Sequence, residues 1–138
     1  MTVVVDASVA VKWVIPEVLS DRADALRDRA DRLLAPDLLL VEAGNALWKK
    51  VSRREISTRE ATQALDLLMT SALDLRPSGP LLPRALGLAV RLRHPVYDCV
   101  YLALAHGEGA ALVTADRRLL ARAARRRSRP TVIDLATL

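Results

Sequence analysis

The stretch Thr-Val-Val-Val-Asp-Ala-Ser at residues 2–8 decides the fold class. Its β-branched run, Thr2–Val5, predicts a short strand buried on both faces, as the strands of parallel sheets are. Asp6 follows the strand directly, and a helix is expected over Ala7–Val14, ended near Pro16. A buried strand that leads through an acid into a helix is typical of an α/β protein.

A second unit of the same order lies near the other end of the chain. The apolar run Ala111–Thr114 predicts a buried strand, and Asp116 starts a short basic helix. Apolar periodicity and cap residues predict the remaining elements. Five further helices are expected: over Glu17–Leu33, from the N-cap Asp37 to about Ser52, from Ser57 or Thr58 (with Glu60) to Met69, over Leu81–Arg93, and from Pro95 to about His106. Three further strands are expected at Leu34–Ala35, Ala72–Arg76 and Thr131–Ile133. This alternation predicts a central parallel sheet of about five short strands flanked by helices, three layers in one domain over residues 1–138.

Composition limits the class of protein and of partner. Hydrophobic residues make up 51% of the 138 residues, which excludes a disordered chain. The net charge of +5 and the pI near 10.1 favour a polyanionic partner, although solubility alone also accounts for a basic protein. Aromatic residues make up only 3%, so a base-stacking platform is not expected.

No apolar run approaches the roughly 18 residues of a membrane span. Asp6 interrupts the first apolar run too early for a signal peptide. The single cysteine, Cys99, excludes an internal disulfide. We therefore expect a soluble cytoplasmic protein with no membrane partner.

Acids interrupt the apolar segments at four positions. Asp6 and Asp116 each follow a strand, and parallel strands bring their carboxyl ends, where ligands bind, to one edge of a sheet. Helix capping is the alternative for both. Asp98 lies in the otherwise apolar helix Val96–Ala105, where a carboxylate must be paired, protonated or bound to metal.

The alternatives for Asp98 are a first-turn acid at the helix dipole and a bridge to His94 or Arg91. Glu42 forms a polar stripe with Asn45 and Lys49 on an apolar helix, and a surface salt-bridge stripe is its alternative.

Four converging carboxylates repel each other unless a cation neutralises them. Hard oxygen ligands suit Mg²⁺, for which Mn²⁺ can substitute. Neither His94 nor His106 has a partner at zinc-ligand spacing, so zinc is not expected. An acidic metal site on a basic protein is typical of a nuclease, because basic residues attract the phosphate backbone and metal acts at the scissile phosphate.

The ordered set of motifs resembles the PIN-domain endoribonucleases, and most closely the VapC-type toxins of toxin–antitoxin pairs. The resemblance covers nearly the whole chain through five motifs: Val-Val-Asp-Ala-Ser at 4–8 with Lys12-Trp13, Ala-Pro-Asp-Leu-Leu at 35–39, Glu42-Ala-Gly-Asn45-Ala-Leu-Trp48, Val-Tyr-Asp98-Cys-Val-Tyr-Leu-Ala-Leu-Ala at 96–105, and Leu-Val-Thr114-Ala-Asp116-Arg-Arg-Leu at 112–119.

The resemblance implies a PIN-like fold and cleavage of RNA, with tRNA and rRNA as candidate substrates, by a Mg²⁺- or Mn²⁺-dependent hydrolase. It also implies a homodimer and a cognate VapB-like antitoxin that blocks the site. The implied catalytic and metal-binding residues are Asp6, Glu42, Asp98 and Asp116, with supporting polar groups on Ser8, Asn45 and Thr114.

The arginine-rich stretch after Asp116 has no single interpretation. Arg117 and Arg118 are candidate RNA contacts, together with Arg122, Arg125, Arg126, Arg127 and Arg129. A solvated helix face and an antitoxin-binding surface are the alternatives.

Two other classes of protein fit parts of the pattern. A Mg²⁺-binding receiver module needs a phospho-accepting Asp on a middle strand and a late strand-end Lys. Leu73-Asp74-Leu75 is a poor acceptor, and the late strands lack Lys. A non-catalytic interaction domain is the third reading, and the four filled acidic positions argue against it.

Overall fold

The computed structural model describes residues 1–125 and 130–138. Its centre is a five-stranded parallel sheet in the order β3-β2-β1-β4-β5. The strands are β1 (Thr2–Val5), β2 (Arg32–Pro36), β3 (Asp74–Arg76), β4 (Ala111–Thr114) and β5 (Val132–Asp134). The predicted α/β class, parallel sheet and number of strands are therefore confirmed.

The pairing of β1 with β4 positions the edge where the site lies. The two strands are parallel, and Val5 pairs with Val113. The next residues along the strands, Asp6 and Thr114, are therefore neighbours at the carboxyl edge of the sheet. Val3, Val4 and Val5 are all buried, as expected for a strand covered on both faces.

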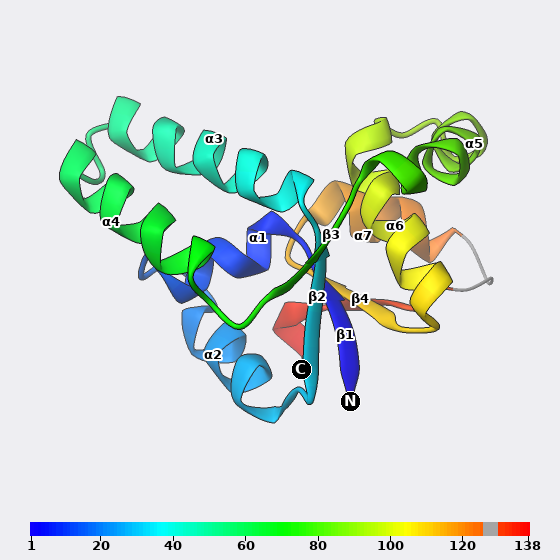
Figure 1. Cartoon of the computed structure of the whole chain (residues 1–138), viewed down its shortest axis with the longest axis horizontal. Helices are drawn as coiled ribbons and strands as arrows, with labels where there is room; N and C mark the ends of the chain where they lie inside the picture. The colour runs from blue at the N-terminus through cyan, green and yellow to red at the C-terminus, as the bar shows by residue number, and fades with distance from the viewer. Residues whose placement is uncertain (126–129) are drawn as a thin grey trace.

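Helices lie on both sides of the sheet (Figure 1). On one side lie α1 (Ala7–Ala10), which continues as a 3₁₀ turn over Val11–Trp13, α2 (Ser20–Arg29), α3 (Leu38–Ser52) and α4 (Thr58–Met69). On the other side lie α5 (Leu82–Leu92) and α6 (Val96–Glu108), and α7 (Arg117–Ala124) packs next to β5. This is the expected three-layer arrangement. Within residues 1–125 and 130–138, no helix is long and apolar enough to cross a membrane.

The predicted helix over Glu17–Leu33 is wrong at its C-terminal end. Helix α2 ends at Arg29, and Leu33 and Leu34 belong to β2, where they pair with Val3 and Val4. Leucine fits the apolar spacing of both a helix and a buried strand, so pairing with the central strand decides the outcome.

Two predicted caps have different outcomes. Ser57 and Glu60 form the expected capping box at the start of α4. Asp37 occupies the cap position of α3 but makes no cap bond, which corrects its predicted role. Its Oδ1 accepts hydrogen bonds from the amide and hydroxyl of Ser78 instead, and the Ser78 hydroxyl accepts from the amide of Leu38, 3.2 Å away. A serine from a distant segment thus supplies the cap.

Candidate active site

Asp6 is buried at the carboxyl edge of β1, with only 5% of its surface exposed. Its Oδ1 accepts hydrogen bonds from the Ser8 hydroxyl, 2.5 Å away, and from the Val9 amide, 3.3 Å away. Its Oδ2 accepts from the Thr114 hydroxyl. The bond from Val9 caps α1, so the capping alternative is correct in part, but the hydroxyls of Ser8, in the first turn of α1, and of Thr114, at the end of β4, also hold the carboxylate.

The two hydroxyls that hold Asp6 are themselves held by the β4–α7 connection. The Ser8 Oγ accepts from the amide of Ala115 at 3.0 Å, and the Thr114 Oγ1 accepts from the amide of Asp116 at 2.9 Å. Each hydroxyl therefore accepts from the backbone and donates to Asp6. This network fixes the orientation of the Asp6 carboxylate relative to Asp116.

Asp98 reaches the same edge from the first turn of α6. The helix after it is buried over Cys99–Ala105, so Asp98 lies between a packed helix and the surface. Its Oδ2 lies 2.5 Å from the Nε2 of the buried His94. The predicted alternative of a bridge to His94 is therefore present, and it engages one carboxylate oxygen.

Glu42 lies in the first half of α3 and faces α6. Its Oε1 accepts a hydrogen bond from the Tyr101 hydroxyl at 2.6 Å. Tyr101 is fully buried, and the sequence interpretation missed it because the two residues are 59 positions apart. The available signal was the spacing of Tyr101, three residues after Asp98 on the same apolar helix.

Asp116 caps a helix and also lines the surface next to the other acids. Its Oδ1 accepts from the amides of Arg118 and Leu119, so it caps α7 as the capping alternative expects. Its side chain also lies where two hollows of the surface meet, because it lines both. One hollow, of about 590 Å³, contains Asp98, and the other, of about 640 Å³, contains Glu42.

Burial and mutual repulsion perturb three of the four acids. Burial raises the pKa of Asp6 from 3.8 to about 6, against the opposing hydrogen bonds from Ser8, Thr114 and Val9. Burial also raises the pKa of Glu42 and that of Asp98, each bonded to a partner that partly offsets the rise. The negative charge of Asp98 adds to the rise at Asp6 and at Glu42, and that of Asp116 to the rise at Glu42 and Asp98. The four acids therefore form one electrostatic cluster.

The remaining predicted residues lie on either side of this cluster. Asn45, Lys49 and Ser8 line the hollow next to Glu42. Arg118 lines the hollow next to Asp98. Arg117 does not line this hollow: its Nη1 donates to Asp134 on β5 at 2.9 Å, and its contact with RNA stays a prediction.

Three arginines of the predicted stretch lie outside the described residues: Arg126, Arg127 and Arg129. The sequence interpretation also did not single out Arg93, which lines the hollow next to Asp98 from the α5–α6 turn.

The donor atoms of the cluster fit a hard cation without enclosing one. Among residues 1–125 and 130–138, no group of three or more His, Cys, Asp or Glu side chains converges closely enough to hold an ion. Carboxylate and hydroxyl oxygens nevertheless predominate, and Mg²⁺ is usually bound by one or two carboxylates with water and phosphate oxygens as its other ligands. Burial raises the pKa of Asp6, Glu42 and Asp98, with a smaller contribution from neighbouring carboxylates, and a cation at this place would favour their ionised forms.

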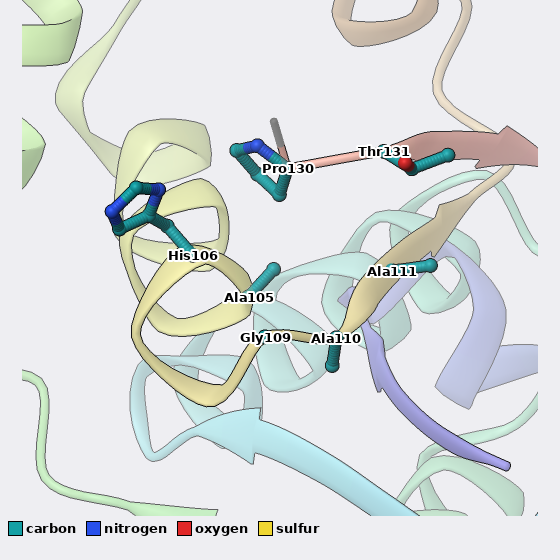
Figure 2. A pocket seen from close by; sticks show the side chains of 7 residues that line it. All are labelled: Ala105, His106, Gly109, Ala110, Ala111, Pro130 and Thr131. Atoms are coloured by element: carbon teal, nitrogen blue, oxygen red, sulfur yellow. The ribbon is translucent and has the colours of Figure 1, made fainter. Parts of the chain in front are cut away.

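A further cavity, of about 320 Å³, lies away from the acids (Figure 2). It lies between the end of α6 and the start of β4, with Pro130 and Thr131 across it. Ala111 begins β4, so this cavity is at the amino edge of the sheet, opposite the cluster. His106 is its one ionisable lining residue in the described part of the chain, and the cavity does not contribute to the candidate site.

The candidate phospho-acceptor of a receiver module is in the wrong place. Asp74 begins β3, which is an edge strand, and its carboxylate bonds to Arg32 and Arg76. Asp74 therefore does not lie at the carboxyl end of a middle strand, where a receiver module has its phospho-acceptor.

Comparison with known proteins adds independent observations. A model of the PIN domain family matches residues 3–126. Ribonuclease VapC3 of Pyrobaculum aerophilum is 36% identical over 121 residues, which cover 86% of this chain and 92% of that protein. Ribonuclease VapC12 of Mycobacterium tuberculosis is 34% identical over 117 residues, which cover 85% of this chain and 88% of that protein.

Two solved structures have the same fold. The crystal structure of PAE2754 from Pyrobaculum aerophilum has a TM-score of 0.73 at 29% identity and covers 99% of this chain and 94% of that one. VapBC2 from Rickettsia felis, bound to a DNA fragment from its promoter, has a TM-score of 0.66 at 13% identity and covers 97% of this chain and 98% of that one.

Proposed function

This chain belongs to the PIN-domain family, and from that premise we propose that it is a metal-dependent endoribonuclease, the toxin of a VapC-type toxin–antitoxin pair. One observation carries the proposal. Segments far apart in the sequence bring Asp6, Glu42, Asp98 and Asp116 to one edge of the sheet, where the charge of Asp98 raises the pKa of Asp6 and Glu42 and that of Asp116 raises the pKa of Glu42 and Asp98. Ribonuclease VapC relatives that align with most of the chain support RNA as the substrate.

Mg²⁺ is the proposed cofactor, and Mn²⁺ is expected to replace it. Asp6 and Asp98 are the proposed direct ligands, and Glu42 and Asp116 are proposed to act through water or at a second position. When bound, the cation would activate a water molecule and stabilise the charge that develops on the phosphate and the leaving oxygen. The all-oxygen donor set and the repulsion among the acids support this choice.

The side chains of the cluster have separate tasks in hydrolysis. The oxygen of water bonds to phosphorus, one ester P–O bond breaks, and the proton of the water passes to a carboxylate. Glu42 suits the last role because Tyr101 holds its Oε1, which leaves Oε2 for the water, and because burial raises its pKa. Ser8 and Thr114 keep Asp6 oriented while this occurs.

A VapB-like antitoxin and a second copy of the chain are the proposed protein partners. The structure of VapBC2 from Rickettsia felis supports the antitoxin. The second copy is supported by an apolar stripe on α5, where Leu82, Leu86 and Val90 are spaced four residues apart and are 46%, 60% and 72% exposed. Leu86→Glu is expected to convert a dimer to a monomer in sedimentation analysis, and a monomeric wild-type protein would refute the dimer.

Cleavage of a tRNA pool tests the proposed function. Wild-type protein is expected to cleave in Mg²⁺ or Mn²⁺ and to stop when EDTA is added. Asp6→Asn is expected to abolish cleavage, whereas Asp66→Asn, a matched change on α4 away from the cluster, is expected to leave it intact. Full activity of purified Asp6→Asn, or cleavage by wild type in EDTA, contradicts the proposal.

A further inference from the structure

The hollow next to Asp98 is lined by four arginines in addition to its two acids. Arg93 lies in the turn between α5 and α6, and the other three are on or just after α7: Arg118, Arg122 and Arg125. Arg118 and Arg122 are four residues apart, so they share one helix face, which is the face toward the hollow. Two separate elements thus direct guanidinium groups at one concavity.

These arginines are not held in ion pairs in the described part of the chain, although Asp98 and Asp116 line the same hollow. Within residues 1–125 and 130–138, none of the four forms an ion pair, and the charges on Arg118 and Arg122 repel each other at this spacing. Arg117, one residue away, differs because it is paired with Asp134. The arginines of the hollow are therefore charged groups whose repulsion an external anion would relieve.

Arg93 has a backbone conformation that favours glycine. Arg93 ends α5 in the left-handed region, at φ 52°, where glycine fits at lower cost than any residue with a side chain. The cap bond at this position runs from the backbone amide to Ala89, so folding does not need the guanidinium. The side chain of Arg93 instead lines the hollow that contains Asp98.

We propose that Arg93, Arg118, Arg122 and Arg125 form a subsite for the backbone phosphates of single-stranded RNA beside the scissile bond. The inference rests on the proposed function and adds the path of the substrate. Guanidinium groups bind phosphate through paired, charge-assisted hydrogen bonds. Because the hollow contains Asp98 and Asp116, a strand held by the arginines passes directly over the acids.

The arrangement of charge favours a continuous strand over an isolated anion. The acids repel phosphate, and basic groups lie on both sides of them: the arginines in one hollow and Lys49 in the other. Asp116 lines both hollows, so the two surfaces are contiguous at the acids. A polyanion that spans both hollows meets positive charge before and after the acidic cluster.

The test compares two triple variants with the same net charge. The subsite variant carries Arg93→Gln, Arg118→Gln and Arg122→Gln. The control carries Arg29→Gln, Arg53→Gln and Arg59→Gln, which change exposed arginines on α2, after α3 and on α4. Each variant loses three positive charges, so any difference between them is local.

Binding of a 20-nucleotide, fluorescein-labelled, single-stranded RNA is measured by anisotropy in EDTA, between 50 and 300 mM KCl. Each phosphate contact contributes about 0.7 to the slope of log affinity against log salt, so the subsite variant is expected to lower the slope by about 2. The control variant is expected to keep the wild-type slope. Equal slopes in the two variants overturn the subsite.

The outcomes separate the subsite from the proposed function. If wild type fails to cleave RNA in Mg²⁺, the proposed function fails, and the binding slopes still judge the subsite. If cleavage occurs but only the affinity for an acidic peptide falls in the subsite variant, the hollow is a peptide site and the inference is wrong. If the triple variant does not fold, each single variant carries the same test with an expected slope change of about 0.7.

Discussion

Replacing the buried Asp6 by asparagine is expected to stabilise the metal-free protein at neutral pH while it abolishes cleavage. Asp6 is 5% exposed, and burial raises its pKa from 3.8 to about 6. Its folded-state pKa therefore lies above its unfolded value, so its contribution to stability is fully present below pH 4 and is lost as the pH rises through about 6.

The magnitude follows from the shift itself. A difference between 3.8 and about 6 corresponds to about 3 kcal/mol of unfavourable free energy for the ionised form at pH 7.5. Asparagine has nearly the same shape and no charge, so Asp6→Asn removes this cost. For a chain of this size, about 3 kcal/mol equals roughly 10 °C in Tm.

Thermal unfolding in EDTA at pH 4.5 and pH 7.5 measures the effect. About 1 kcal/mol of this cost is already present at pH 4.5, because that pH lies above the unfolded-state pKa of 3.8. The Tm difference between Asp6→Asn and wild type is therefore expected to grow by about 6 °C from the lower to the higher pH. Any loss of hydrogen bonds to Ser8 or Thr114 in the variant lowers its Tm equally at both pH values, so it cancels when the two Tm differences are compared. Mg²⁺ is expected to raise the Tm of wild type at pH 7.5 but not that of Asp6→Asn. Parallel pH profiles of variant and wild type would refute the reasoning.

Three further predictions address other contacts. Tyr101→Phe removes the hydrogen bond that lowers the pKa of Glu42, so the acid limb of the pH–rate profile is expected to move to higher pH, with cleavage reduced roughly tenfold; an unmoved profile argues against this role. Ser57→Ala breaks the capping box of α4 and is expected to cost about 1 kcal/mol in urea unfolding, with cleavage unchanged; loss of activity at full stability is the contrary result. Arg117→Gln removes an ion pair that is 75% exposed on the arginine side, so stability is expected to change by less than about 1 kcal/mol, and the salt dependence of RNA binding is expected to stay the same; a shallower slope would return Arg117 to the RNA-binding surface.

The sequence predicted the features that depend on short, uniform patterns. Thr2–Val5 and Ala111–Thr114 are apolar runs of strand length, and both are strands with those bounds. Asp6 and Asp116 were predicted to share an edge because parallel strands end together, and that geometry is present. The ends of α2 and β2 were not predicted, because leucine fits the spacing of a helix and of a buried strand equally well.

The partners of the acids were beyond the reach of sequence patterns. The bond from Tyr101 to Glu42 joins two helices whose relative position only the packed sheet determines. Arg117 and Arg118 are adjacent in sequence, yet one turns to β5 and the other to the hollow, because successive helix residues point in different directions. Which direction faces the acids depends on how α7 packs, so the pattern of charge alone could not assign the two roles.

The convergence of the four acids into one divalent-cation site is tested most directly by Mn²⁺ binding, followed by electron paramagnetic resonance at pH 7.5. Wild type and the matched control Asp66→Asn are expected to bind Mn²⁺ with the same affinity. Asp6→Asn and Asp98→Asn are each expected to weaken that binding at least tenfold while the protein stays folded. Equal Mn²⁺ affinity in wild type and in both of these variants would contradict the assignment of the acids to a common metal site.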